Sequence, residues 1–321
     1  MITPRIVLIA AALAVPCTAT AQNYPTKPIR IVVVSTPGGS VDTMARTVGP
    51  KLAERWGQQV LVDNRPGAGG AIAAEIVAKA PPDGYTLIMG TVASFATNVS
   101  LRKSLPYDPV KDFSPITLVA TQNLMLLVHP SVPAKSVKDL IALAKKQPGK
   151  LSFASAGNGT GGHLSGELFK MLAHIDMLHI PYKGVQPALI DVVSGQVTMT
   201  FASIISAMPQ VTNKRLRPLA VTGDQRSPAA KELPTMIEAG VKDYESATWY
   251  GLLAPANTPQ DIVTKLNTEV VAILKNPETH ERLSREGADP VGNSPAAFAK
   301  HIQSEIDKWR KVIRAAGIQP S

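Results

Sequence analysis

A strand, a glycine-containing turn and the start of a helix follow one another twice in this chain, and this repeated unit most constrains its fold. The first unit is the apolar run Ile29–Val34, then Ser35-Thr36-Pro37-Gly38-Gly39-Ser40 and a helix. The second is Leu151–Ala154, then Ser155-Ala156-Gly157-Asn158-Gly159-Thr160 and another helix. Free backbone N–H groups and the positive end of the helix dipole make each turn an anion site. The pair predicts a small anionic ligand held between two lobes.

The first 21 residues read as a secretory signal peptide. Arg5 precedes an apolar run, Ile6–Val15, and Ala19-Thr20-Ala21 provides a cleavage site after Ala21. The apolar run is too short to span a bilayer, so an uncleaved anchor is the weaker alternative. Cleavage removes the single cysteine, and the mature chain is left without disulfides, a thiolate nucleophile or a cysteine zinc site.

The formal net charge is +9, and the basic residues are scattered rather than clustered. Aromatic residues make up only 5%, which disfavours the stacking platforms that bind single-stranded nucleic acid. The charge supports only a weak attraction for anionic ligands or surfaces, and with scattered basic residues and few aromatic ones no nucleic-acid partner is expected.

Predicted strands and helices alternate along the chain, which is typical of an α/β fold with mainly parallel sheets covered by helices. Expected helices include 41–55, 137–146 capped by Ser136, and a last helix opened by Ser294-Pro295. Two extended stretches, 115–129 and one within 223–254, can cross between the lobes. We therefore expect 22–122 and 229–321 to form a discontinuous first lobe and 123–228 a second.

Most candidate ligand-binding residues lie in the two turns, while Ser94 lies just past another strand and Ala202-Ser203 follow the expected strand 197–201. Glycine lets a ligand approach the backbone closely, and nearby hydroxyl and amide groups add donors. The alternative for each hydroxyl is a local cap or turn bond, and for the glycines it is close strand–helix packing. The predicted set is Thr36, Gly38, Gly39, Ser40, Ser94, Ser155, Asn158, Gly159, Thr160, Ala202 and Ser203.

Catalytic, metal and cofactor sites are not predicted. Gly157-x-Gly159-x-x-Gly162 fits a dinucleotide fingerprint, but the next strand ends in Pro181-Tyr182-Lys183, without the acidic residue that binds a ribose. The six histidines have no metal-ligand spacing, and no nucleophile elbow is present. His163 reads as a structural histidine, and Asp42 suits the positive end of the first helix.

Ordered motifs along the mature chain resemble the Bug family of periplasmic solute-binding proteins, the receptors of tripartite tricarboxylate transporters. The motifs are Tyr24-Pro25-x-Lys27-Pro28-Ile29-Arg30, Pro37-Gly38-Gly39-x-x-Asp42, Asn64-Arg65-Pro66-Gly67-Ala68-Gly69-Gly70, Pro82-Asp83-Gly84-Tyr85-Thr86-Leu87, Leu105-Pro106-Tyr107-Asp108-Pro109, Gly157-Asn158-Gly159-Thr160-x-x-His163, His179-x-Pro181-Tyr182-Lys183-Gly184 and Leu219-Ala220-Val221-Thr222.

This resemblance implies a two-lobe Venus-flytrap fold of the type II binding-protein class, without catalysis or cofactor. It implies a periplasmic monomer that holds a mono-, di- or tricarboxylate through the turns 36–40 and 155–160 and delivers it to a permease. Two alternatives stay open: a receptor that signals to a membrane sensor kinase, and an exported hydrolase or lyase.

Two departures from the family pattern bear on the ligand. Relatives usually have an aromatic-Pro pair where this chain has Ser35-Thr36, and many have Asp-Asn where it has Ala202-Ser203. The missing carboxylate removes a partner for a ligand amine. We therefore expect a preference for plain carboxylates over amino acids.

Overall fold

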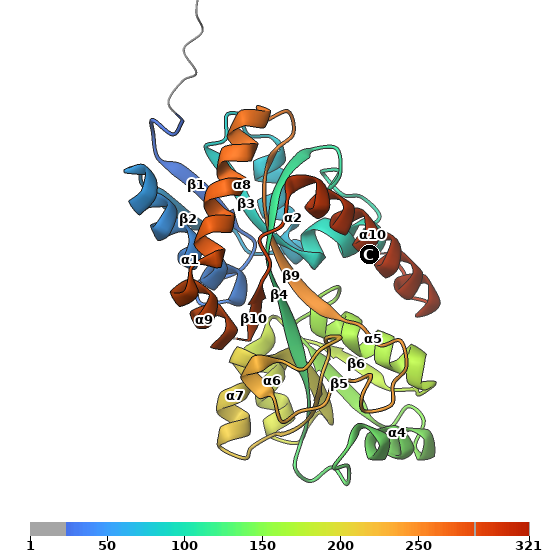
Figure 1. Cartoon of the computed structure of the whole chain (residues 1–321). Helices are drawn as coiled ribbons and strands as arrows, with labels where there is room; N and C mark the ends of the chain where they lie inside the picture. The colour runs from blue at the N-terminus through green and yellow to red at the C-terminus, as the bar shows by residue number, and fades with distance from the viewer. Residues whose placement is uncertain (1–23, 286, 321) are drawn as a thin grey trace, which may run out of the picture.

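Two lobes joined by two long strands make up the computed structural model (Figure 1). It describes residues 24–285 and 287–320, and the predicted signal peptide, 1–21, with its cleavage site lies outside these residues. The joining strands are β4 (Phe113–Val128) and β9 (Ala247–Pro255). β4 leads from the first lobe into the second and β9 returns, so the two strands pair antiparallel, from Phe113↔Pro255 to Asn123↔Ala247.

The other elements alternate as the sequence predicts. The remaining strands are β1 (Ile29–Val33), β2 (Val60–Asn64), β3 (Thr86–Thr91), β5 (Ser152–Ser155), β6 (Leu178–Pro181), β7 (Met199–Ser203), β8 (Arg217–Val221) and β10 (Ala288–Pro290). The α-helices are α1 (Ser40–Trp56), α2 (Ala71–Ala78), α3 (Asn98–Leu101), α4 (Val137–Lys146), α5 (Gly161–Ala173), α6 (Val185–Val193), α7 (Ile204–Thr212), α8 (Gln260–Lys275), α9 (Pro277–Arg285) and α10 (Pro295–Ala315). A π-helix, η2 (Ala93–Thr97), precedes α3, and short 3-10 helices span Ala68–Gly70 and Pro228–Ala230.

One continuous sheet runs through both lobes in the order β2-β1-β3-β9-β4-β7-β5-β6, with β8 and β10 also paired to β4. The outer strands are parallel: β1 pairs with β2 and β3, and β5 pairs with β6 and β7. Every pairing of β4 or β9 is antiparallel, because these strands carry the chain from one lobe to the other and back. The predicted α/β class is confirmed, and the antiparallel junction is its exception.

Helices cover both faces of the sheet and bury its apolar side chains. α1 and α8 lie over one face in the first lobe, and α6 and α7 pack on their own cluster in the second. A larger cluster on the other face joins α2, η2 and α10 to α4 and α5. Within the described residues, no helix is both long enough and apolar enough to cross a membrane.

Local capping signals placed several helices correctly. The Ser136 side chain accepts a hydrogen bond from the Asp139 amide at the start of α4, and Ser294 accepts one from Ala297 at the start of α10. One face of α10 carries a buried apolar stripe, and its members are Phe298, Ile302, Ile306, Trp309 and Ile313. Full burial of one such side chain stabilises the fold by about 1.5–3 kcal/mol.

Candidate functional site

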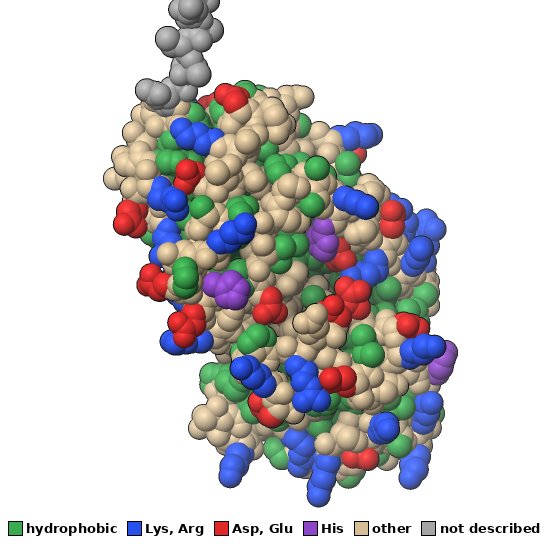
Figure 2. All heavy atoms as spheres, in the orientation of Figure 1, with side chains coloured by type: hydrophobic (Ala, Val, Ile, Leu, Met, Phe, Trp, Pro, Cys, Tyr) green, Lys and Arg blue, Asp and Glu red, His purple; other side chains and the backbone are tan. Residues whose placement is uncertain are grey.

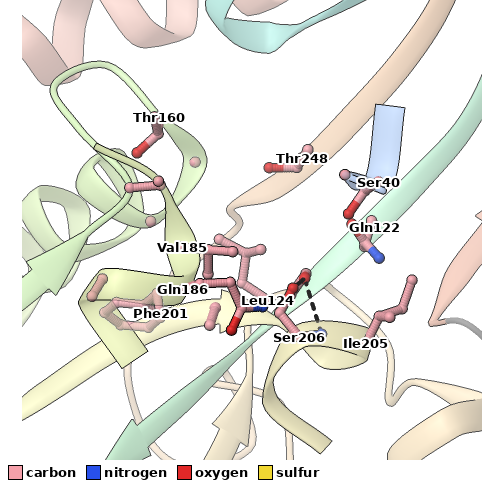
Figure 3. A pocket seen from close by; sticks show the side chains of 18 of the residues that line it. Ser40, Gln122, Leu124, Thr160, Val185, Gln186, Phe201, Ile205, Ser206 and Thr248 are labelled. Carbon is pink, nitrogen blue, oxygen red and sulfur yellow. Dashed lines mark hydrogen bonds between the residues drawn. The ribbon is translucent and has the colours of Figure 1, made fainter. Parts of the chain in front are cut away.

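A cavity of about 450 Å³ lies between the two lobes, and we call it the interlobe cavity (Figure 3). The first lobe lines it with residues from the first turn, α1, β4 and β9: Thr36, Pro37, Gly38, Gly39, Ser40, Thr43, Gln122, Thr248 and Tyr250. The second lobe lines it with Leu124, Ala156, Thr160, Gly161, Gly162, Lys183, Gly184, Val185, Gln186, Pro187, Ala188, Thr200, Phe201, Ala202, Ser203, Ile205 and Ser206.

The first turn joins β1 to α1 and is hydrogen-bonded to the buried Asp42, which lies in the first turn of α1. Gly38 adopts φ +80°, and its amide donates to Asp42 Oδ2 at 2.9 Å. Asp42 also accepts from Arg46 and from Asn64 Nδ2. Burial alone would raise the pKa of Asp42, but these hydrogen bonds hold it below its ordinary value. Its charge is thus neutralised within the first lobe.

The second turn joins β5 to α5 and is also braced by its own side chains. Thr160 Oγ1 donates to the Gly157 carbonyl at 2.7 Å, and the Gly159 amide donates to His163 Nδ1 at 3.0 Å. Gly159 adopts φ +77°, which suits glycine. These bonds fix the position of the N-terminus of α5 at the cavity.

Helix N-termini from both lobes converge on the interlobe cavity. α1 begins after Gly39, α5 after Thr160 and α6 after Gly184, and in the described part of the chain none of these three caps makes a side-chain hydrogen bond to its helix. A fourth helix, α7, is capped by Ser203, whose Oγ accepts from the Ser206 amide. Uncapped N-termini leave backbone N–H groups to be satisfied by water or a ligand, and their dipoles favour an anion.

The side chains lining the cavity add little charge of their own. Of the lining residues in the described chain, only Lys183 is a basic residue, and none is an aspartate or glutamate. Leu124, Val185, Phe201 and Ile205 form an apolar part of the wall, while Ser40, Thr160 and Thr248 present hydroxyl groups (Figure 3). The cavity therefore suits a small ligand with an anionic group and an apolar body.

The structure brings part of the predicted site together. Thr36, Gly38, Gly39, Ser40, Thr160, Ala202 and Ser203 line the interlobe cavity. The other predicted residues lie outside its lining: Ser94, Ser155, Asn158 and Gly159.

Local hydrogen bonds engage three of these four residues, and the fourth, Asn158, is exposed. Ser94 Oγ bonds to the Thr91 backbone, and Ser155 Oγ bonds to the Gly157 backbone and to His179 Nε2. Asn158 is exposed, and the Gly159 amide is taken by His163. The local-bond alternative therefore holds for both serines.

Sequence reasoning missed the parts of the site that the crossing strands and the third helix supply. Gln122, Thr248 and Tyr250 come from β4 and β9, whose pairing is long-range and leaves no local signal. The Tyr250 hydroxyl donates to Gln122 Oε1; burial raises its pKa, and a hydrogen bond with Ser40 opposes that rise. By contrast, the turn before α6 had a signal in Pro181-Tyr182-Lys183-Gly184, a third strand–turn–helix unit.

Two histidines stack behind the second turn. The His163 and His179 rings lie 4.0 Å apart, centroid to centroid, and are inclined by 17°. Burial lowers the pKa of His163 to about 4, with Lys170 adding to the effect. Burial, His163 and Lys170 lower that of His179 to about 3. Both rings are neutral at pH 7 and brace the turn. The described residues hold no group of three or more His, Cys, Asp or Glu side chains suited to a metal ion.

The sequence also matches a known protein family. Residues 44–318 match the family described as the tripartite tricarboxylate transporter family receptor. The chain belongs to this family. The predicted resemblance is confirmed, and the protein is a transporter receptor with a two-lobe binding-protein fold.

Solved structures of similar receptors cover nearly all of the chain. R. palustris Rpa4515, solved with adipate, is 41% identical with a TM-score of 0.87, covering 93% of this chain and 100% of its own. The periplasmic binding protein BugD is 33% identical with a TM-score of 0.82, covering 93% and 100%. MatC from Rhodopseudomonas palustris, solved with bound malate, is 33% identical with a TM-score of 0.80, covering 90% and 100%.

Proposed function

We propose that this receptor captures a small organic carboxylate in the interlobe cavity and delivers it to a tripartite tricarboxylate transporter permease. The observation that carries the proposal is the convergence of three helix N-termini, from α1 in one lobe and α5 and α6 in the other. A carboxylate that accepts hydrogen bonds from both sides joins the lobes directly. Adipate in Rpa4515 and malate in MatC support this ligand class.

Backbone donors are strong enough for this task. A hydrogen bond to a charged group contributes about 1.5–3 kcal/mol net. Micromolar binding needs about 8 kcal/mol. Four or five such bonds, divided between the lobes, would therefore suffice after the cost of ordering the closed form.

Ligand capture would couple to movement of the lobes. A ligand that contacts both lobes favours the closed arrangement by its difference in affinity for the two states. We also propose that the second lobe extends to about residue 246, rather than 228. Supporting this, the Met236 amide donates to Val221, the Tyr244 hydroxyl to the Ser165 carbonyl and the Ser246 amide to Thr222.

The wall opposite α1 favours plain carboxylates over amino acids. Ala202 and Ser203 line this wall, and the Ser203 hydroxyl is engaged with Ser206 at 2.8 Å. Neither side chain offers a negative charge to a ligand ammonium group. An amino acid would therefore bury its ammonium without a charged partner, which is costly.

We further propose that the receptor works as a periplasmic monomer after cleavage at Ala21 and releases its ligand unchanged. A thermal-shift screen of mono-, di-, tri- and aromatic carboxylates tests the function, because a true ligand raises the melting temperature by mass action. Calorimetry of each positive compound gives its affinity, and NMR of the recovered compound tests for turnover. A flat screen contradicts the proposed function, and a chemically altered ligand supports the enzyme alternative.

A further inference from the structure

A second, separate cavity of about 820 Å³ lies on the first lobe between the segment after α3 and helix α10, and we call it the α3–α10 groove. Its lining residues are Val99, Arg102, Lys103, Leu105, Pro106, Tyr107, Asp108, Pro109, Val110, Lys111, Asp112, Gln303, Ile306 and Arg310. None of these residues lines the interlobe cavity.

Apolar side chains lie exposed in this groove. Val110 is 51% exposed and Val99 is 36% exposed, and the lining also includes the half-buried Leu105 and the buried Ile306. An apolar strip bordered by charged residues is typical of a protein–protein contact.

The charge around this strip is mainly positive. Arg102, Lys103, Lys111 and Arg310 line the groove, and a neighbouring cavity of about 380 Å³ shares Val99 and Arg310 and continues to Arg314. In Figure 2, Lys and Arg side chains gather over α10.

The acidic residues of the groove are largely occupied by the chain itself. Asp108 accepts from the amides of Val110 and Lys111, and Asp112 Oδ2 accepts from the Asp108 amide. Lys111 Nζ lies 3.6 Å from Asp108 Oδ2, but its side chain is 84% exposed, so this pair is weak. Arg310 pairs with Asp307 at 2.8 Å along α10, whereas the exposed side chains of Lys103 and Lys111 are open to acids from outside.

The Arg102 side chain contains a hydrogen-bond donor without an acceptor in the described part of the chain. Its Nε is buried and has no hydrogen-bond partner among the described residues. A buried donor left unsatisfied costs about 1–3 kcal/mol. Because this atom is closed to solvent, an acidic side chain in the groove could accept from it only after the Arg102 side chain turned outward.

The groove is also continuous with a contact between the lobes. Arg102 directly follows α3, whose last residue, Leu101, packs against the second turn: a Cβ added at Gly159 would lie 2.4 Å from Leu101 Cδ1. Thr97 Oγ1, just before α3, donates to the Gly159 carbonyl at 3.2 Å. A partner bound in the groove would therefore contact the segment around α3, which itself contacts the second lobe.

We propose that the α3–α10 groove docks an acidic segment of the membrane permease, with apolar residues of that segment lying over Val99 and Val110. This inference rests on the proposed function, since it assumes a permease partner. Charge complementarity of this kind mainly raises the rate of association and fixes orientation, as a receptor that must dock and leave repeatedly requires.

Binding of the purified receptor to its permease in lipid nanodiscs tests the proposal by biolayer interferometry at low and high salt. The groove variant is Lys103→Glu with Lys111→Glu, at two exposed positions where the fold is not at risk. The matched control is Lys145→Glu with Lys146→Glu, the same charge change on the exposed end of α4. We expect the groove variant to bind about tenfold more weakly and the control to stay within about twofold of the unmodified receptor.

Equal weakening of the two variants would indicate a general attraction to the membrane and would contradict docking at the α3–α10 groove. Unaltered binding by the groove variant would contradict it as well. Empty nanodiscs report lipid binding alone, and an unmodified receptor that prefers them to the loaded discs also contradicts the proposal. A thermal-shift screen on both variants separates the two ideas. If carboxylates stabilise every variant equally, a docking failure leaves the proposed function intact. If they stabilise none, including the unmodified receptor, the proposed function fails by itself.

Discussion

Thr97 Oγ1 donates a hydrogen bond of 3.2 Å to the carbonyl oxygen of Gly159. This bond joins the π-helix of the first lobe to the second glycine turn of the other, 62 residues along the chain. The same turn positions the N-terminus of α5 at the interlobe cavity. The lobe contact and the proposed ligand grip therefore share one loop.

The substitution Gly159→Val is expected to weaken carboxylate binding at least about tenfold. Its Cβ would lie 2.4 Å from Leu101 Cδ1, and φ +77° strains a β-branched residue by about 1–3 kcal/mol. Calorimetry measures the affinity, and circular dichroism checks that the variant folds. Thr97→Val, which removes only the hydrogen bond, is the milder control. An unaltered affinity in folded Gly159→Val would count against the role of this turn.

Gly39→Val should reduce affinity while sparing stability. Gly39 has φ −76°, an extended conformation open to any residue, so the backbone is not strained. An added Cβ would lie 3.1 Å from the flexible Ser35 Oγ and 3.3 Å from the Thr36 carbonyl oxygen, so a small local shift would accommodate it at a residue that lines the cavity. We expect a loss of about tenfold or more in calorimetry with a melting temperature near that of the unmodified protein. Tight binding by this variant would argue that the ligand avoids α1.

Ser203→Asp is expected to shift selectivity from plain carboxylates toward amino acids. Aspartate still caps α7, so the helix keeps its start, but a negative charge now faces the cavity. Competition calorimetry with adipate and aspartate measures the change, and neutral Ser203→Asn is the matched control. Should the unmodified receptor already prefer aspartate over every plain carboxylate tested, the proposed selectivity is wrong.

The free energy of unfolding should fall as the pH drops from about 6.5 toward 4. The buried rings of His163 and His179 have pKa values lowered to about 4 and about 3, so the unfolded chain binds protons that the folded chain excludes. Stability is thus complete above the unfolded pKa of about 6.5 and declines below it. Urea titrations at pH 7.5, 6.0 and 5.0 measure this loss.

His163→Asn is the informative variant for this effect. An asparagine oxygen can still accept from the Gly159 amide but does not titrate. Glu167 Oε1 lies 4.0 Å from His163 Nε2, and Lys170 pairs with Glu167 at 3.0 Å, so these charged groups largely offset each other. We expect a flatter pH dependence in the variant, and an identical slope would assign the acid sensitivity to other groups.

Ligand addition should compact the molecule in small-angle scattering. A carboxylate bridging α1 and α5 favours the closed arrangement, so the radius of gyration should decrease at saturation. The Gly159→Val variant provides the comparison, because its damaged lobe contact should reduce the change. A constant radius with saturating ligand would contradict a flytrap mechanism.

Local sequence signals predicted the individual helices and strands better than the way in which the strands pair. Apolar periodicity and capping serines placed α4 and α10, because these depend on neighbours within a few residues. The extended stretches predicted to cross between the lobes, 115–129 and one within 223–254, contain most of β4 and all of β9, but nothing local indicated that these two strands pair with each other. The contribution of Gln122 and Thr248 to the cavity followed from that pairing and was missed with it.

Local signals also could not show which of the predicted serine hydroxyl groups would line the cavity. Ser40, at the start of the first helix, and Ser94, just past a strand end, were both predicted to face the ligand. Ser40 lines the cavity, whereas Ser94 bonds to Thr91 within its own turn. Ser94 lies in the π-helical turn η2, which has no sequence signature, so its bond to Thr91 could not be predicted.

The continuous strand β4 makes the two halves of this receptor inseparable. Its residues up to Asn123 pair with β9, and those from Leu124 onward pair with β7 and β8. A fragment ending between these residues would leave either half with an unpaired edge in the middle of its sheet, open to aggregation. Neither half is a module that could be expressed alone or exchanged between relatives, so changes in ligand preference must arise by substitution within one intact molecule.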